Sequence, residues 1–364
     1  MLLPELPILC GETLQSLKDL REGMTVSGGV GWGEMGTSAI QDIFVQYDHK
    51  GPLLTIKTAK GSELHCSPDH PCFGRLNSLS RHYSLYLHER STLGFRVGMT
   101  QDLMKDLLAM PNLRPSESDQ GQVVDRLWII ETTENLPKVL FLTTFASCKY
   151  GLPNVPFSAK QLNNEMSDEL IRELYNRIDT PSRARQFLMD SVMFEEFPHI
   201  TLRHAKSGQI ASSAIQFVLF GGSERNRDTG RYSHVIRIDG SVELKNSDGR
   251  QFKRRMNAQG AWNLEVTRDD IEEATLFVKT LSCLDNLEIV KKIQLTRKNP
   301  FYLLPASHLK AGMVIPVHGR QGIEEDIVTS ISLEQYQGPL FDLKVEGINN
   351  FVAGNVLIMG FAGH

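Results

Sequence analysis

Two stretches of the chain repeat one another, and they decide the fold that the sequence predicts. Residues 18–26 read KDLREGMTV and residues 307–315 read SHLKAGMVI; residues 51–57 read GPLLTIK and residues 338–344 read GPLFDLK. From the methionine of the first motif to the glycine of the second there are 27 positions in one copy and 25 in the other. Gly-Met and Gly-Pro-Leu are also ordinary openings of turns and strands. Two motif pairs in the same order and at nearly equal spacing nevertheless favour an internal duplication.

The segments around these motifs have the character of β-strands. Each Gly-Pro pair is followed by a short apolar-rich run, and similar runs lie just upstream. Such strands at short spacing predict a β-rich fold formed from two pseudo-symmetric halves, residues 1–76 and 301–364. The runs expected to form these strands are 37–45, 53–58, 326–331 and 340–345.

A long insert, residues 77–300, separates the two halves. The entropy of closing a loop grows slowly with its length, so a folded insert of this size is tolerated. Its pattern predicts an inserted α+β domain, with subdomains at 77–160 and 161–300 as one option. Strands are expected at 83–87, 94–98, 126–130, 209–220 and 232–244, a loop at 114–122, and helices at 135–150, at 166–193 with a break at Pro181, and at 267–283 with Thr267 at its start.

Composition limits the classes of protein that the chain can belong to. The 364 residues carry a net charge of −4, with 41% hydrophobic and 23% charged residues. These values exclude a polybasic chain and leave room for two or three domains. The sequence has no run of about 18 apolar residues, and its start, MLLPELP, lacks the basic segment of a secretion signal. Five scattered cysteines favour a reducing compartment. We therefore expect a cytoplasmic protein without a membrane partner.

A cluster of histidines and cysteines, HCSPDHPC, occupies residues 65–72. A structural zinc site needs a second, well-spaced pair of ligands, and the sequence offers none, so no metal is expected here. A thiolate beside an imidazole could in principle act as a nucleophile. The commonest fate of a cysteine is to be a small buried hydrophobe, and we favour that interpretation for Cys66 and Cys72.

The duplicated halves, the SPDH block at residues 67–70 and the closing run FDLKVEGINNFVAGNVLI at residues 341–358 resemble the inteins, whose fold is the Hint domain. The resemblance covers both ends of the chain. In detail the sequence is most similar to the large inteins of bacterial UvrD/Rep-type DNA helicases, and the insert shares their character at residues 95–100 and 149–157. It implies flanking host-protein segments (exteins), with a DNA helicase as a candidate host, and autocatalytic cleavage without any cofactor.

The resemblance also implies roles for particular residues. In an intein the first residue attacks the preceding carbonyl to give a thioester, and a Thr/Ser-x-x-His block supplies an imidazole that polarises that peptide. Ser67 and His70 match this block. An aspartate in the closing strand tunes the first thiol, and Asp342 matches it. A final His-Asn pair cyclises the asparagine and cuts the downstream peptide.

The sequence departs from the family pattern at the reacting positions. Met1 stands at the nucleophile position, Met359 and Gly360 stand at the His-Asn position, and Asn349 stands where a histidine is expected before Asn350. A thioether cannot form a thiolate, and glycine has no amide to cyclise. The implied protein is a Hint domain that is defective in splicing. An alternative register places the nucleophile at Cys10 and implies autoprocessing by thioester chemistry there.

Inserts of inteins are commonly homing endonucleases, so a DNA-binding site-specific endonuclease is a further alternative. The LAGLIDADG class needs paired helices that each end in an acid, and the sequence shows no such pair. A GIY-YIG-like core fits better, with Tyr83, Arg96 and Arg126 (or Arg114) as candidates and Mg²⁺ as its cofactor. The position expected for its metal-binding carboxylate, residues 139–145, contains no acid, so cleavage is expected to be impaired.

Basic residues in the insert predict contact with double-stranded DNA through its phosphates. The alternative is that they form solvated faces balanced by the acids at residues 265–273. The residues concerned are Arg225, Arg227, Arg231, Arg250, Lys253, Arg254 and Arg255, with Arg203, His204 and Lys206 nearby.

Overall fold

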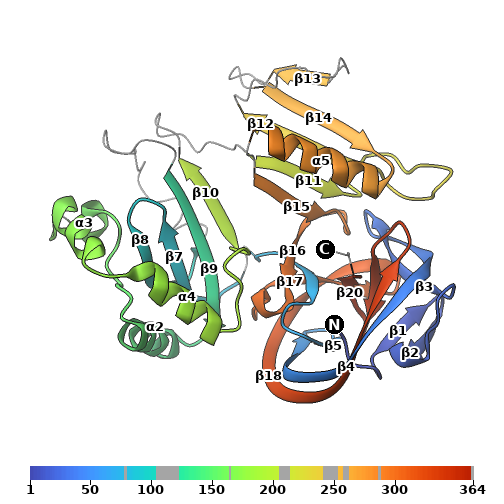
Figure 1. The fold of residues 1–364 in the computed structure, drawn as a ribbon, viewed down its shortest axis with the longest axis horizontal. Coiled ribbons are helices and arrows are strands. Elements are labelled where there is room, and N and C mark those ends of the chain that lie inside the picture. Colours follow the sequence, from blue (N-terminus) through green and yellow to red (C-terminus); the bar gives the residue numbers. More distant parts are fainter. Residues whose placement is uncertain are drawn as a thin grey trace. The chain divides into compact units, whose positions relative to one another are not determined.

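The structure is a computed structural model that describes residues 1–77, 80–103, 123–163, 165–204, 214–240, 253–256, 262–285 and 288–361. The chain divides into two compact units, which we call the terminal unit and the inner unit. The terminal unit contains residues 1–76, 213–309 and 313–364, and the inner unit contains residues 77–212 and 310–312. Strands far outnumber helices in the described part (Figure 1). The β-rich class predicted from the sequence is therefore confirmed.

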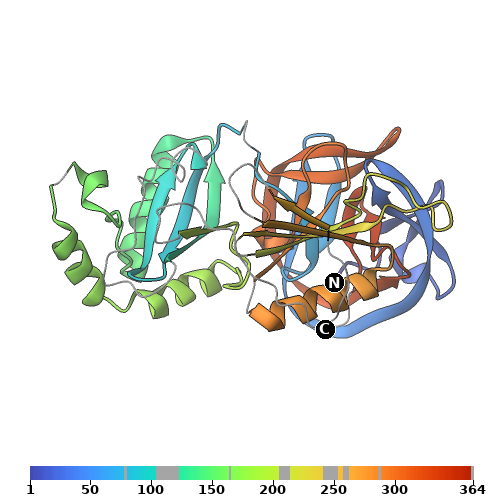
Figure 2. The same cartoon turned by 90° about the horizontal axis from the view of Figure 1, so that it is seen from above.

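The terminal unit is built on one branched sheet of 16 strands among the described residues. Its main path runs β13-β14-β12-β11-β15-β16-β6-β20-β17-β18-β4-β3, with β1, β2, β5 and β19 attached to the side. Helix α5 (Ile271–Asp285) lies along one face of β11, β12 and β14 (Figure 2). The strands are β1 (Pro7–Cys10), β2 (Thr13–Ser16), β3 (Thr25–Gly31), β4 (Glu34–Thr58), β5 (Glu63–Cys66), β6 (Pro71–Gly74), β11 (Ala214–Leu219), β12 (His234–Gly240), β13 (Lys253–Met256), β14 (Trp262–Arg268), β15 (Glu288–Ile293), β16 (Phe301–Pro305), β17 (Val314–Gly319), β18 (Gly322–Val345), β19 (Asn350–Ala353) and β20 (Val356–Met359).

The two sequence repeats form the same local structure. Each begins with a short 3₁₀ helix, η1 (Leu17–Asp19) or η3 (Ala306–His308). A turn follows, in which Gly23 and Gly312 have φ values of 82° and 87°, a conformation that glycine adopts without strain. A hairpin comes next, β3–β4 in the first copy and β17–β18 in the second. The repeats are therefore equivalent in structure as well as in sequence.

The long strands β4 and β18 pair with each other antiparallel, and their register is symmetric. Gly51 lies opposite Tyr336, and Gly338 lies opposite His49, so each Gly-Pro motif faces the residue two positions before its counterpart. Outside the sheet ladder, Ile40 donates its N–H to the carbonyl of Met24, and Val328 donates to the carbonyl of Met313 in the same way. The internal duplication predicted from the sequence is thus confirmed by a pseudo-twofold pairing.

The repeats also contribute equivalent residues to the core. Leu20 and Leu309 end η1 and η3, and each is only 1% exposed. Burying a leucine fully stabilises a fold by roughly 1.5–3 kcal/mol. Both leucines belong to the same core cluster, so each repeat stabilises one shared core. That core continues beneath α5, where Ala274 and Val278 pack against the same cluster.

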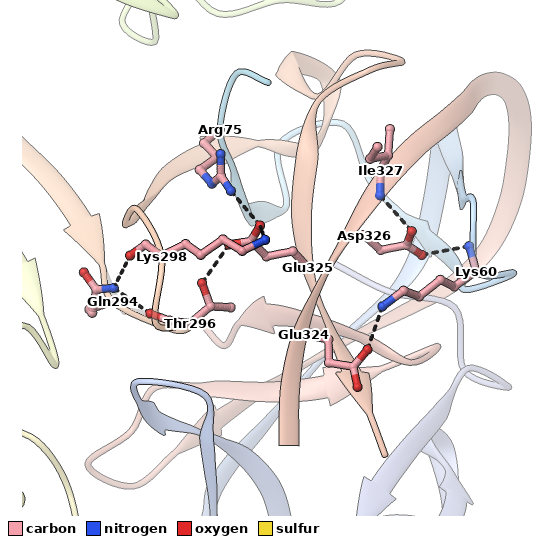
Figure 3. A network of polar contacts seen from close by, with 9 residues as sticks. All are labelled: Lys60, Arg75, Gln294, Thr296, Lys298, Glu324, Glu325, Asp326 and Ile327. Carbon is pink, nitrogen blue, oxygen red and sulfur yellow. Dashed lines mark hydrogen bonds and ion pairs between the residues drawn. The ribbon is translucent and has the colours of Figure 1, made fainter. Parts of the chain in front are cut away.

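One carboxylate joins three segments of the terminal unit (Figure 3). Glu325, on β18, accepts hydrogen bonds from Arg75 at 2.7 Å, from Thr296 at 2.9 Å and from Lys298 at 3.1 Å. Arg75 directly follows β6, and Thr296 and Lys298 precede β16. The positions where the chain leaves and re-enters the terminal halves are therefore both bonded to Glu325.

The inner unit contains a sheet of order β10-β9-β7-β8 with two helices on one face. Leu87, Val97 and Trp128 of the sheet pack against Val139 of α2 and Ala184 of α4. The described elements are β7 (Tyr83–Arg90), β8 (Gly94–Thr100), β9 (Val123–Thr133), β10 (Ile200–His204), α2 (Leu136–Tyr150), η2 (Ala159–Leu162), α3 (Asp168–Asn176) and α4 (Thr180–Asp190).

Several local predictions for the insert are confirmed. The β7–β8 hairpin and strand β9 lie where the alternation placed them. Helix α2 ends at Gly151, whose φ of 65° is the left-handed C-cap conformation. Pro181 separates two helices by standing in the first turn of α4, where its missing N–H costs no hydrogen bond. The loop predicted at residues 114–122 lies outside the described residues.

Two details differ from the prediction. Helix α5 begins at Ile271, whereas Thr267 belongs to β14; Asp270 is the capping residue, because its carboxylate accepts a hydrogen bond from the N–H of Glu273 at 2.7 Å. Contacts also group residues 161–212 with 77–160, while residues 213–309 group with the chain ends. Sheet pairing explains this grouping, because β15 joins β11 to β16.

None of the helices in the described part of the chain is long and apolar enough to cross a membrane.

Candidate functional site

The SPDH block forms the turn between β5 and β6. The N–H of His70 donates to the carbonyl of Ser67 at 3.1 Å and closes this turn. The segment η3 holds it from the other repeat, because Ala306 donates to the carbonyl of His70 and Ser307 to that of Pro68. Ser67 and His70 therefore point from a turn that both halves of the duplication support.

Met1 is held beside this turn by backbone hydrogen bonds. Leu2 and Phe341 exchange two bonds of 2.7 and 2.9 Å, and Ser67 donates its N–H to the carbonyl of Met1 at 2.8 Å. The amino nitrogen of Met1 lies 2.6 Å from Ser67 Oγ and 3.1 Å from His70 Nδ1. The first residue, the turn and the closing strand thus meet at one point.

Asp342 completes the cluster from β18. Its Oδ2 lies 3.4 Å from His70 Nδ1 and 4.0 Å from the amino nitrogen of Met1. The side chain is 3% exposed, and His70 is 1% exposed. The structure therefore brings together four of the residues singled out in the sequence: Met1, Ser67, His70 and Asp342.

Burial sets the protonation state of the imidazole. Desolvation lowers the pKa of His70, and the neighbouring amino group lowers it further, against the opposing effect of Asp342. The ring is therefore neutral near pH 7, and Nδ1 can accept a hydrogen bond from the nitrogen of Met1. Nε2 is buried without a hydrogen-bond partner among the described residues. A neutral imidazole against a backbone nitrogen is equipped to hold or transfer one proton there.

Cys66 and Cys72 lie on the strands that flank the turn, and both are buried free thiols. A hydrogen bond with Cys66, together with burial, raises the pKa of Cys72 well above its ordinary value. A thiol in this state is a poor nucleophile. The arrangement fits the interpretation of these cysteines as buried hydrophobes.

The closing residues lie against the strand that carries Asp342. Gly360 donates its N–H to the carbonyl of Asn349 at 2.9 Å, and Phe361 donates to the carbonyl of Leu343 at 2.8 Å. Met359, 8% exposed, ends β20. A Cβ at Gly360 would lie 2.6 Å from the carbonyl oxygen of Leu343, so a larger residue needs a backbone shift.

The alternative nucleophile, Cys10, occupies a different environment. It ends β1 and pairs with Thr13, whose hydroxyl donates to its carbonyl at 3.0 Å. Burial raises the pKa of its thiol, which lowers the thiolate fraction. Cys10 packs against the core cluster of the terminal unit, whereas Met1 is the residue that contacts Ser67 and His70.

The endonuclease candidates do not converge. Tyr83 packs on the face of the inner sheet that carries α2 and α4. Arg126 lies opposite Glu89 in the sheet, and Glu89 is on the same face of β7 as Leu87. The guanidinium of Arg126 is 3.3 Å from the Glu89 carboxylate. Arg96 lies opposite His88 on the other face, where it donates to the hydroxyl of Tyr86 at 2.6 Å. The tyrosine that meets Arg96 is thus Tyr86, which only the register of the hairpin could identify.

Two of the predicted DNA-binding arginines are engaged inside the terminal unit. Arg225 forms an ion pair with Glu34 at 2.8 Å, and Arg231 donates to the hydroxyl of Ser38 at 3.3 Å. These contacts give both residues a structural role. Lys253, Arg254 and Arg255 lie on the edge strand β13, Arg227 lies in the segment between β11 and β12, and Lys206 and Arg250 fall outside the described residues.

The described residues contain no group of three or more His, Cys, Asp or Glu side chains arranged to hold a metal ion. Fold and site together define a β-rich protein of duplicated hairpins that holds its first residue against a buried imidazole.

No family model matches the sequence, and no curated protein matches it. Among solved structures, a mutant variant of the Ssp DnaB mini-intein matches with 10% sequence identity, covering 99% of this chain and 98% of that chain, at a TM-score of 0.28. At this TM-score the two structures are too different for functional residues to be transferred between them.

Proposed function

We propose that the terminal unit is an intein-like Hint scaffold that has lost protein splicing. The observation that carries the proposal is the position of the Met1 nitrogen, 2.6 Å from Ser67 Oγ and 3.1 Å from His70 Nδ1. On this proposal the partners of the unit are host segments joined to its two ends.

The chemistry follows from that position. When a residue precedes Met1, the nitrogen at this point is the amide nitrogen of the peptide to be cleaved. Cleaving the peptide by an acyl shift requires that this nitrogen gain a proton. A neutral His70 would first take the proton of an attacking thiol at Nδ1 and then pass it to this nitrogen as the C–N bond breaks. Asp342 would stabilise the imidazolium that exists between these two steps, and Ser67 would orient the nitrogen.

The same geometry explains why the chain is expected to be inactive. Met1 offers a thioether, which cannot attack a carbonyl as a thiolate does. Gly360 offers no side-chain amide, and Asn349 is not an acid–base group in this pH range. The scaffold keeps the residues that assist the reaction and lacks those that undergo it.

The test restores the missing nucleophile. The chain is expressed between two folded tags, as it stands and as Met1→Cys, and fragment masses are measured with and without added thiol. We expect thiol-dependent release of the N-terminal tag from Met1→Cys and none from the unaltered chain. His70→Ala in the Met1→Cys chain is the matched control, and it should abolish release.

Two outcomes would contradict the proposal. Ligated tags from the unaltered chain would show that splicing is intact. Release that disappears in Cys10→Ser would instead assign autoprocessing to Cys10. The proposal does not extend to nuclease activity, because Tyr83 and Arg126 lie on the opposite face of the sheet from Arg96.

A further inference from the structure

The second face of the inner sheet is polar and yet buried. Tyr86, His88 and Arg90 of β7 lie on it, with Arg96 of β8 and Asp125 of β9. Each of the five is less than 9% exposed. Alternation along the strands separates this face from the apolar one under α2 and α4.

Aromatic rings cover the charged residues. The ring of Phe157 lies 5.0 Å from the guanidinium of Arg90 and 5.8 Å from that of Arg96. It also meets the ring of His88 at 4.9 Å, and Tyr175 packs behind it at 5.0 Å. The two guanidinium groups are therefore held in a largely water-excluded environment.

The charges of the described residues on this face do not balance. Arg90 donates to both carboxylate oxygens of Asp125, at 2.9 and 3.0 Å. Arg96 forms no ion pair with the described residues; its hydrogen bond goes to the neutral hydroxyl of Tyr86, and its Nε has no partner. Among the described residues, one buried positive charge is left over.

The imidazole of His88 leaves the excess positive charge unchanged. Its Nε2 lies 3.5 Å from Asp125, beyond hydrogen-bond geometry, and neither ring nitrogen has a hydrogen-bond partner among the described residues. Burial lowers the pKa of His88 to about 4, so the ring is neutral near pH 7. A neutral imidazole offers one N–H donor in addition to the unused donor of Arg96.

We infer that this face of the inner unit binds a small tetrahedral oxyanion, inorganic phosphate or sulfate, at Arg96. A buried cation without a partner is costly, and an anion that accepts its free N–H groups removes that cost. The planar fork of arginine matches the oxygens of such an ion. Gly98 lets the guanidinium lie directly against the backbone of β8, because a Cβ there would come within 2.7 Å of an Arg96 nitrogen. The aromatic cover favours a small ion over a polymer.

The test measures binding of inorganic phosphate to the full chain by equilibrium dialysis and by the unfolding temperature, at constant ionic strength set with chloride. We expect saturable binding and a rise in unfolding temperature with phosphate. Above the dissociation constant, each tenfold increase in phosphate should favour the folded state about tenfold. Arg96→Gln should abolish the effect. Arg126→Gln, which removes a cation from the opposite face, should leave it unchanged.

Each alternative outcome is decisive. Dialysis of the unaltered chain needs no variant, so failure to retain phosphate or sulfate there overturns the proposal even if Arg96→Gln does not fold. An equal response to chloride, or an equal loss in Arg126→Gln, would also overturn it. Retention of a DNA duplex without retention of free phosphate would replace the small ion by a polymeric phosphodiester. The proposal stands apart from splicing, and the tag-release assay does not bear on it.

Discussion

Two buried imidazoles, one in each unit, lie at nearly the same distance from an aspartate. His70 is 3.4 Å from Asp342, and His88 is 3.5 Å from Asp125. At His70 a third group, the nitrogen of Met1, occupies Nδ1. At His88 neither ring nitrogen has a hydrogen-bond partner within the described part of the chain, and the carboxylate is held by Arg90. A buried His–Asp pair therefore does not define a site by itself, because the group that meets the ring decides what the ring can do.

The two pairs should differ most in how much stability is lost when the aspartate is replaced by alanine. Asp125→Ala leaves Arg90 and Arg96 buried without a carboxylate among the described residues, so we expect the inner unit to lose about 3–5 kcal/mol of stability. Asp342→Ala should cost less, since Met1 is only partly buried, with its side chain 22% exposed. Hydrogen exchange of the β7 and β9 amides, compared with those of β4 and β18, measures both effects. Equal losses in the two variants would remove the distinction between the pairs.

The buried imidazole of His88 makes the stability of the inner unit depend on pH, and the expected change is similar in size to the loss in Asp125→Ala. Its pKa is about 4 in the folded chain against 6.5 for the free group, so the unfolded chain binds the extra proton between these values. The contribution of His88 to the free energy of unfolding is therefore fully present above pH 6.5. It falls by about 3 kcal/mol as the pH drops to 4.

His88→Gln should flatten that part of the profile, read from the β7 amides at pH 6.5 and 4.5. His234, whose pKa burial also lowers to about 4, lies in the terminal unit, and His234→Gln is the matched control. An unchanged profile in His88→Gln would show that the ring is already protonated in the folded chain.

A substitution at Gly360, near the end of the chain, should cause a smaller loss of stability. Gly360→Asn places a Cβ 2.6 Å from the carbonyl of Leu343, and we expect a cost of about 1–3 kcal/mol from the forced shift. Met359→His keeps the backbone in place and is the control. Urea unfolding of both variants, followed through the β4 and β18 amides, gives the difference. A Gly360→Asn chain as stable as the original would mean that the closing segment yields without cost.

The smallest expected effect tests the two faces of the inner sheet. Arg126 is 41% exposed and pairs with Glu89 on the edge of the α2/α4 face. Arg126→Ala should therefore cost less than about 1 kcal/mol, as exposed ion pairs do. A loss as large as that of Asp125→Ala, measured by the same exchange experiment, would place Arg126 in the buried network.

Most of the structure that could be predicted from the sequence follows from short motifs and single residues. The Gly-Met and Gly-Pro motifs gave the duplicated hairpins, and Gly151 and Pro181 gave helix boundaries, because these residues act through their own backbone angles. The cluster at His70 was predicted through the resemblance, and the structure brings its members together. By contrast, the choice between Tyr83 and Tyr86 depends on which strand face meets Arg96, and residues three apart on a strand lie on opposite faces. The grouping of residues 213–309 with the chain ends depends on the pairing of β15 with β16, which no short motif encodes.

The bonds around Glu325 have a consequence for how the chain could be shortened. Strands β6 and β16 are antiparallel neighbours, with Gly74 opposite Tyr302, which is the arrangement of an ordinary hairpin. Everything between them stands in the place of that hairpin's turn, and the same side chain ties both of its ends. A few turn-forming residues joining Arg75 to Thr296 should therefore close the gap, although the shortened chain loses the contacts that Arg225 and Arg231 make with β4. The terminal halves would then be a small, contiguous β-domain, a form in which the cluster at Met1 could be studied by itself.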